Sequence, residues 1–130
     1  MITEKPGFSP LAEKYILSVG DDVNLLSSRH LVLQSAGYQV LSIESGVLLQ
    51  HPIGSHFDLL LLCHTLQTAT ANRIVRWSST VRPGQPVLWI YSANSLRDRP
   101  EGQFATCSAI PEELLRTIGS LLGAGTLLQN

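Results

Sequence analysis

The feature that most constrains the fold is an apolar run in the middle of the chain, Asp58-Leu-Leu-Leu-Leu-Cys63-His64-Thr65-Leu66. Near-continuous aliphatic runs of this length are typical of strands that are buried on both faces of a parallel sheet. In open parallel sheets, ligands bind just beyond the carboxyl ends of the strands. We therefore expect a central strand over residues 58–66, and any chemistry of the protein close to Cys63.

Extended and helical patterns alternate on both sides of this run. Four further apolar segments predict strands, at 15–19, 38–43, 87–92 and 104–108. Apolar residues at helical spacing predict helices that begin near Asp22, Ser45, Thr68 or Thr70, and Pro111. Five strands joined by right-handed crossovers form a parallel sheet with helices on both faces, so we expect a three-layer α/β sandwich.

Boundary residues support several of these elements. Asp21 or Asp22 is expected to cap the first helix, and Gly37 to follow it, because the residue after a helix end often has a positive φ. Ser45 is expected to cap the second helix. Residues 94–102 contain a single apolar side chain, so the fourth helix is expected to be shortened or missing. The apolar stripe of the first helix consists of Leu25, Leu26, Val32, Leu33 and Ala36.

Length and composition limit the organisation of the chain and its surroundings. With 130 residues we expect one domain over 14–123, an irregular lead-in at 1–13 and a short tail at 124–130. A net charge of −1 without a basic cluster argues against nucleic acid as a partner, and no stretch approaches the roughly 18 apolar residues that cross a bilayer. Cys63 and Cys107 form neither a disulfide framework nor a CxxC pair, which favours a reducing, cytoplasmic location.

Several motifs, taken in order, resemble those of one known family, the receiver domain of bacterial two-component response regulators. The resemblance covers nearly the whole chain and implies a flavodoxin-like fold with strand order 2-1-3-4-5. The motifs are Ile16-Leu-Ser-Val-Gly-Asp-Asp-Val-Asn-Leu-Leu26, Ala36-Gly-Tyr-Gln-Val40, His56-Phe-Asp-Leu-Leu-Leu-Leu-Cys63, Pro86-Val-Leu-Trp-Ile-Tyr-Ser-Ala93 and Pro111-Glu-Glu-Leu-Leu115.

The resemblance also implies a phosphoacceptor pocket that has lost most of its groups. A working receiver uses two loop acids for Mg²⁺, an aspartate nucleophile, a Thr or Ser hydroxyl and a lysine. Here Gly20 and Asp21 take the acid positions, with Asp22 after them, and Cys63 takes the position of the nucleophile. Magnesium prefers oxygen ligands, so a thiolate is a poor substitute, and only Asp21 and Asp22 remain as weak candidates for a cation.

The switch and lysine positions complete this degenerate pocket. Ser92 retains the switch hydroxyl and Phe104 takes the aromatic switch position, so the two imply a switch or partner surface. Depending on the alignment, Cys107 or Ile110 stands where the family has its lysine. Without that lysine, little would stabilise the charge on a transferring phosphoryl group. We therefore expect no phosphorylation and no cofactor.

Other chemistry at Cys63 remains open as an alternative. Cys63 could support a thiol-dependent or metal-assisted enzyme, although neighbouring strand residues point to opposite faces, so His64 would activate it only if the strand has ended. A soft metal held by Cys63, His64, Asp21 and Cys107 would lack any recognised zinc spacing. A Cys63–Cys107 disulfide is not expected, because the fourth strand separates the third from the fifth. A small-ligand sensor using the same crevice is the other alternative.

The favoured hypothesis is that the chain is a stand-alone receiver-like signalling domain, which is not an enzyme and acts through a protein partner. A shortened fourth helix would uncover the edge strand at 104–108, so self-association as a homodimer is expected there. His30, His51 and His56 are expected at the surface or in loops without partners. Trp77 and Trp89 are expected in core or half-buried packing.

Overall fold

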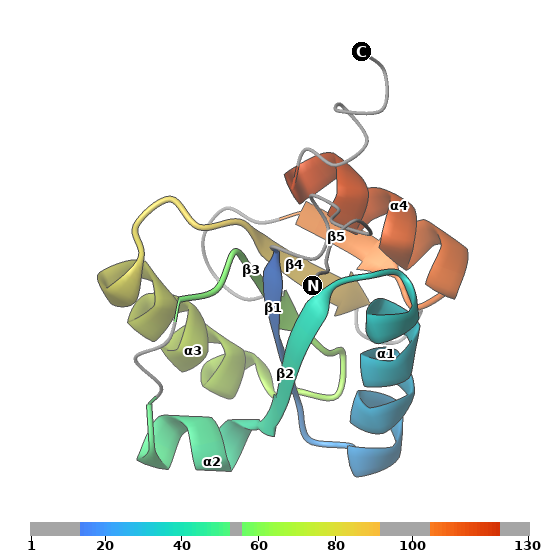
Figure 1. Ribbon diagram of the computed structural model, residues 1–130. Coiled ribbons are helices and arrows are strands. Elements are labelled where there is room, and N and C mark those ends of the chain that lie inside the picture. The colour runs from blue at the N-terminus through green and yellow to red at the C-terminus, as the bar shows by residue number, and fades with distance from the viewer. Residues whose placement is uncertain (1–13, 53–55, 92–104, 123–130) are drawn as a thin grey trace, which may run out of the picture.

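The computed structural model of the protein describes residues 14–52, 56–91 and 105–122, with only the backbone of Thr106 and Cys107. Strands and helices alternate along the chain (Figure 1). The elements are β1 (Tyr15–Gly20), α1 (Val23–Ser35), β2 (Gln39–Glu44), α2 (Ser45–Gln50), β3 (Leu59–Leu62), α3 (Thr68–Val81), β4 (Val87–Tyr91), β5 (Ala105–Ser108) and α4 (Pro111–Leu122).

The strands form one parallel sheet in the order β2-β1-β3-β4-β5. Helices α2 and α3 cover one face of this sheet, and α1 and α4 cover the other (Figure 1). The parallel α/β architecture with three layers is therefore confirmed. Because the carboxyl ends of β1 and β3 lie side by side, with Val19 next to Leu62, the loops after these two strands meet at one edge of the sheet.

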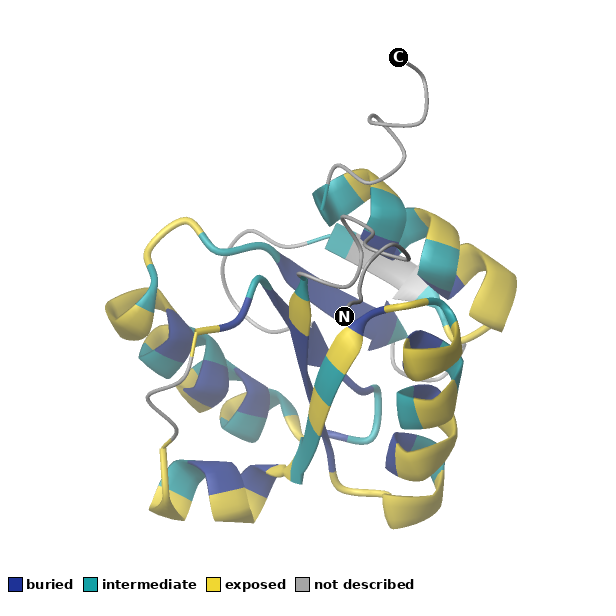
Figure 2. Cartoon of the chain, viewed as in Figure 1, coloured by how far each residue is buried: buried dark blue, intermediate teal, exposed yellow. Residues whose placement is uncertain are grey.

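The apolar run of β3 packs into two separate cores. Leu60 and Leu62 point toward α3, whereas Leu59 and Leu61 point toward α1 and α4, because successive side chains of a strand alternate between faces. All four leucines are at most 1% exposed, and their burial contributes roughly 6–12 kcal/mol before conformational entropy is subtracted. Figure 2 shows the buried central strands between partly exposed helices.

The central strand is shorter than the sequence run suggested. We expected a strand over 58–66, but β3 ends at Leu62, and the chain then turns so that the Leu66 N–H donates to the Cys63 carbonyl over 3.1 Å. A turn hydrogen bond of this kind replaces strand pairing after the first polar side chains. Cys63 and His64 therefore lie in a loop, which changes how their side chains are placed.

The helix boundaries agree with the sequence in two places and differ in one. The Asp22 carboxylate caps α1 by accepting from the Asn24 and Leu25 N–H groups, and Gly37 follows the helix with φ 101°, as expected. The prediction that Ser45 caps α2 was wrong. Glu44 precedes that helix without a capping bond, and the Ser45 hydroxyl is used elsewhere.

The buried face of α1 also differs from the expected apolar stripe. Leu26 and Leu33 are buried, but the third buried residue of the helix is Arg29, while Leu25 and Val32 are only partly covered. In the other long helices, the buried residues are Ala71, Ile74 and Ser78 of α3, and Leu114 and Ile118 of α4. A charged side chain therefore enters the core on the α1 side of the sheet.

Of the three histidines that were expected to lack partners, His30, His51 and His56, two have a partner, so the expectation was wrong for these two. His30 Nδ1 lies 2.8 Å from Ser42 Oγ, and His56 Nε2 lies 3.1 Å from Asp58 Oδ1. His51 is exposed at the end of α2. The expectation for the tryptophans is confirmed: Trp89 is fully buried, and the half-buried Trp77 ring stacks on Phe57 with centroids 5.8 Å apart.

Some expectations fall beyond the described residues. The weak segment 94–102, and with it the shortened or missing fourth helix, lies outside them, as do the lead-in at 1–13 and the tail at 124–130. Within the described part of the chain, none of the helices combines the length and the apolar character that crossing a membrane requires.

Candidate functional site at the carboxyl end of β3

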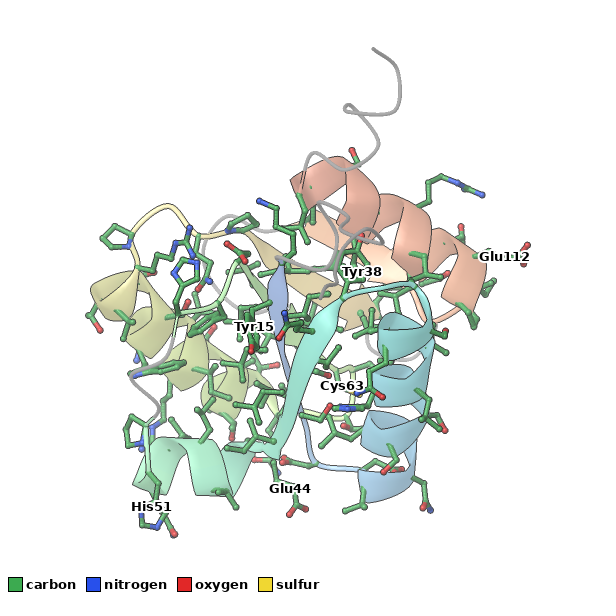
Figure 3. All side chains as sticks on the ribbon, in the orientation of Figure 1. Tyr15, Tyr38, Glu44, His51, Cys63 and Glu112 are labelled. Atoms are coloured by element: carbon green, nitrogen blue, oxygen red, sulfur yellow. The ribbon has the colours of Figure 1, made fainter. Side chains whose placement is uncertain are left out.

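Cys63 is the first residue after β3, and the backbone holds it firmly. Its N–H donates to the Val19 carbonyl over 3.0 Å, which extends the pairing of β3 with β1 by one residue. Its side chain is 3% exposed and lies between the sheet and α1 (Figure 3). The Cys63 side chain is on this face of the sheet because side chains alternate along β3, and Leu59 and Leu61 point to the same face.

A buried arginine from α1 contacts this thiol. Arg29 Nη1 lies 2.8 Å from Cys63 Sγ, and the arginine is only 6% exposed. A guanidinium keeps its charge in proteins, and buried charges need a partner. No carboxylate lies within ion-pair distance of Arg29 among the residues that the structure describes. The sulfur of Cys63 therefore serves as the acceptor for a buried positive charge.

Thr65 and His64 complete the surroundings of the sulfur. The Thr65 hydroxyl donates to Cys63 Sγ over 3.3 Å and accepts from the Asp21 N–H, also at 3.3 Å. His64 Nδ1 lies 3.9 Å from the same sulfur, because β3 has ended and neighbouring side chains no longer point to opposite faces. Burial and the nearby Arg29 charge lower the pKa of His64, against a smaller opposing effect of Asp22. The neutral imidazole is therefore favoured beside Cys63.

The two loop acids do not point to a common site. Asp21 Oδ1 accepts from the Ser45 hydroxyl at 2.6 Å and from the Ser45 N–H at 3.2 Å, which joins the β1 loop to α2. Asp22 is occupied by capping α1. Among the described residues there is no group of three His, Cys, Asp or Glu side chains that could hold a metal ion. Both carboxylates therefore act in the scaffold of the pocket.

Cys63 packs closely against Gly20, which has no side chain. A Cβ atom added at Gly20 would lie 3.0 Å from Cys63 Cβ and 3.6 Å from its sulfur. Contacts of 3.0 Å force neighbouring atoms to move. The residue that the resemblance places at the first acid position thus packs against the one at the nucleophile position, and a side chain larger than that of glycine at position 20 would crowd Cys63.

The remaining predicted site residues are only partly described. Ser92 and Phe104 lie outside the described residues. Cys107 belongs to β5, where its backbone is next to Ile90 of β4, and its side chain is not described. Strand β4 lies between β3 and β5, which is the strand order on which the expectation of no Cys63–Cys107 disulfide depended. Ile110, the alternative at the lysine position, is 54% exposed just before α4.

Sequence reasoning missed Arg29 and the role of Ser45. A signal for Arg29 existed, because it follows Leu26 by three positions and precedes Leu33 by four, inside the apolar face of α1. A polar residue at such a position is buried and needs a partner. No comparable signal marks Ser45, since its contact with Asp21 depends on how the start of α2 meets the loop after β1.

A second polar cluster lies at the opposite end of β3. Asp58 accepts from the Tyr15 N–H over 2.9 Å and contacts His56 Nε2, and Arg82 Nη1 donates to the Phe57 carbonyl and lies 3.4 Å from Asp58 Oδ1. Burial raises the pKa of Asp58, but the Tyr15 hydrogen bond and His56 together outweigh it, so the net pKa is lowered. This cluster fixes the start of β3 and is far from Cys63.

Two hollows accompany the sheet, and neither includes Cys63. A groove of about 640 Å³ runs between α1 and the outer edge of β2, with residues from α2 at its end. A second hollow of about 540 Å³ lies over the first residues of β1 and β2, beside His56 and Phe57. At the carboxyl end of β3, Arg29 instead lies against the Cys63 sulfur.

Comparison with known proteins identifies the fold. No family model matches the sequence, and no curated protein matches it. The fold is similar to the receiver domain of a sensor histidine kinase from Pseudomonas aeruginosa with magnesium in its active-site cleft (TM-score 0.67, 21% identity, covering 85% of this chain and 98% of that one).

Two further structures have the same fold. One is a CheY-like receiver domain protein from Methanospirillum hungatei (TM-score 0.65, 24% identity, covering 85% and 94%). The other is a structure of histidine kinase ThkA in complex with response regulator protein TrrA (TM-score 0.62, 19% identity, covering 84% and 98%). The chain therefore has the flavodoxin-like fold of receiver domains.

Proposed function

We propose that this chain is a degenerate receiver domain of two-component or phosphorelay signalling, which takes no phosphoryl group and acts through protein contact. The observation that carries the proposal is the pairing of Cys63 with the buried Arg29 at the carboxyl end of β3. In a working receiver this place holds an aspartate, which attacks the phosphorus atom beside a Mg²⁺ ion. Here a thiol and an internal guanidinium fill the same space.

The surrounding residues support the same reading. Asp21 is held by Ser45 and Asp22 caps α1, so each carboxylate already accepts hydrogen bonds within the fold, and the described residues include no group of three metal-ligating side chains. The sequence contains two lysines, Lys5 and Lys14, and both precede β1. Lys14 lies at the start of β1, at the end of the sheet opposite to Cys63. A transferring phosphoryl group would therefore lack the lysine that stabilises its charge in a working receiver, and the one cation at this place, Arg29, is buried against the Cys63 sulfur.

Protein contact is the mode of action that remains for such a domain. The structure of a histidine kinase in complex with a response regulator protein has the same fold, which supports a signalling protein as the partner. The free thiol of Cys63 is consistent with a reducing, cytoplasmic location. No step of this proposal requires a cofactor or catalysis.

The proposal is tested by incubating the chain with a small-molecule phosphodonor and Mg²⁺ and measuring its intact mass. We expect no phosphoryl adduct, while a receiver with the complete acid set gains one under the same conditions. The Cys63→Asp variant is the matched control, because it restores a carboxylate but leaves Gly20, Asp21 and Arg29 unchanged. We expect it to remain unmodified too, and a stable adduct on the natural chain would contradict the proposal.

A thiol-dependent activity at Cys63 is a second candidate, since Arg29 and Thr65 both direct donors at its sulfur. The sulfur is the atom that would act as the nucleophile, in its thiolate form. The 3% exposure of Cys63 limits access to it. This candidate predicts rapid alkylation of Cys63 that slows in Arg29→Met. Alkylation that requires unfolding would exclude it.

A further inference from the structure

Strand β2 is an open edge of the sheet without the usual protection. Among the described residues it pairs with β1 alone, and each of its six residues is exposed or partly exposed (Figure 2). Edge strands commonly carry lysine, proline or a bulge that prevents pairing with another chain. The sequence of β2 has neither lysine nor proline, and its one charged residue, Glu44, lies at the end. Within the ranges that the structure describes, the central residues of β2, Val40 to Ile43, have no strand partner besides β1.

Exposed apolar side chains gather around this edge. Seven large apolar side chains are exposed in the described part of the chain, and five of them lie on β1, β2 or the helices beside β2. Three of the five line the groove of about 640 Å³ between α1 and β2. A concentration of this kind on one side marks an interaction surface, which we call the β2 surface. It consists of Tyr15, Val23, Leu31, Leu41 and Val47.

We propose that the β2 surface binds a second copy of this chain, with the two β2 strands paired antiparallel across a two-fold axis at Leu41. Such an axis places Leu41 of one copy opposite Leu41 of the other, which covers a side chain that is 41% exposed. Directly opposite residues of an antiparallel pair lie on the same face, with their Cβ atoms about 5 Å apart. A self-pairing strand needs no other partner to satisfy its open edge.

The charges at the two ends of β2 fit this arrangement. Glu44 lies at one end of the strand and Tyr38 just before the other (Figure 3). With the axis at Leu41, Glu44 lies opposite Tyr38 of the second copy. Lys14 lies next to Tyr38 on the neighbouring strand, because Tyr15 pairs with Gln39. Two strand spacings, about 10 Å, then separate the backbones of Glu44 and Lys14, which extended side chains span together.

This charge complementarity favours a second copy over an unrelated strand. The antiparallel arrangement brings the carboxylate of each copy toward the lysine of the other, and both side chains point to the face of the sheet that α1 covers. A parallel pairing would instead place the two Glu44 carboxylates together. The inference rests on the contact-based function proposed above and names its partner, but the dimer can be tested on unphosphorylated protein without Mg²⁺.

The first test is a concentration series of the whole chain in analytical ultracentrifugation. We expect a reversible dimer, and we expect Leu41→Lys to raise its Kd at least about 100-fold, because two lysines would meet at the axis. Val81→Lys is the matched control, since Val81 is 45% exposed on α3, away from β2. A chain that stays monomeric, or a dimer that is equally sensitive to both variants, would overturn the proposal.

Two further variants test the register and protect against misfolding of a single variant. Glu44→Lys and Lys14→Glu are each expected to raise the Kd about 10-fold, and the double variant is expected to restore it. Leu41→Cys is expected to form a covalent dimer under mild oxidation, whereas Val81→Cys does not. Failure of the charge exchange together with absence of the cross-link would refute this register. An absent dimer leaves the phosphodonor result unchanged, so the two proposals fail separately.

Discussion

Replacing Cys63 by alanine is expected to destabilise the fold far more than the loss of one sulfur atom suggests. The sulfur accepts from Arg29 Nη1 at 2.8 Å, and the arginine is 6% exposed. In Cys63→Ala the guanidinium stays buried without its acceptor. Arg29→Met has a different effect, because it removes the charge while an apolar chain still fills the path between α1 and the sheet.

The expected magnitudes follow from these contacts. A buried donor that loses its acceptor costs about 1–3 kcal/mol, and a charged donor lies at the upper end of that range. The empty volume left by the sulfur adds about 1 kcal/mol. We therefore expect Cys63→Ala to lower the free energy of unfolding by about 2–4 kcal/mol. Once Arg29 is methionine, the same change should cost only about 1 kcal/mol.

Urea unfolding of the four proteins in this double-mutant cycle measures the coupling. We expect a coupling energy between Cys63 and Arg29 of about 1–3 kcal/mol with unchanged m-values. Cys63→Ser should lose less stability than Cys63→Ala, because its hydroxyl can still accept from Arg29. A coupling energy indistinguishable from zero would refute the conclusion that the sulfur is the partner of the buried guanidinium.

Three further predictions concern groups near the two ends of β3. The folded-state pKa of Asp58 is lowered below 3.8, so its contacts stabilise the fold above that pH. In thermal melts at neutral pH, Asp58→Asn should therefore be less stable than the natural chain. This difference in stability should vanish as the pH falls through the folded-state pKa of Asp58. The folded-state pKa of His64 is lowered below 6.5, so between the folded-state and the unfolded-state pKa the unfolded chain binds more protons than the folded chain. The free energy of unfolding should therefore rise as the pH increases toward 6.5. This slope should disappear in His64→Gln. Gly20→Ala places a Cβ 3.0 Å from Cys63 Cβ and should cost about 1–3 kcal/mol in urea unfolding, whereas Gly119→Ala, in open space on α4, should gain about 0.5–1 kcal/mol. Equal effects of the two glycine variants would contradict the close packing of Cys63 against Gly20.

Contact between the site and the scaffold explains why these predictions concern stability as well as function. Thr65 donates to Cys63, and its hydroxyl also accepts from the Asp21 N–H, while Asp21 in turn accepts from Ser45. The loops after β1 and β3 and the start of α2 are therefore joined by side-chain hydrogen bonds. Changes at these residues therefore affect the stability of the fold as well as the site.

The sequence by itself determined the architecture of this protein. The leucines of β3, the cap at Asp22 and the turn at Gly37 act through local periodicity and local backbone preference, which can be read along the chain. The resemblance to receiver domains also placed Cys63 at the carboxyl end of the central strand. Even so, the strand end was misplaced, because turn hydrogen bonds compete with an apolar pattern that continues to Leu66.

Only the tertiary structure decided what surrounds Cys63. Arg29 lies 34 residues away in the sequence, and its contact with the sulfur exists because α1 packs over β3. Likewise Ser45 meets Asp21 across 24 residues, where the start of α2 lies beside the loop after β1. The burial of a charge is decided by packing among distant elements, and no local pattern records which acceptor will satisfy it.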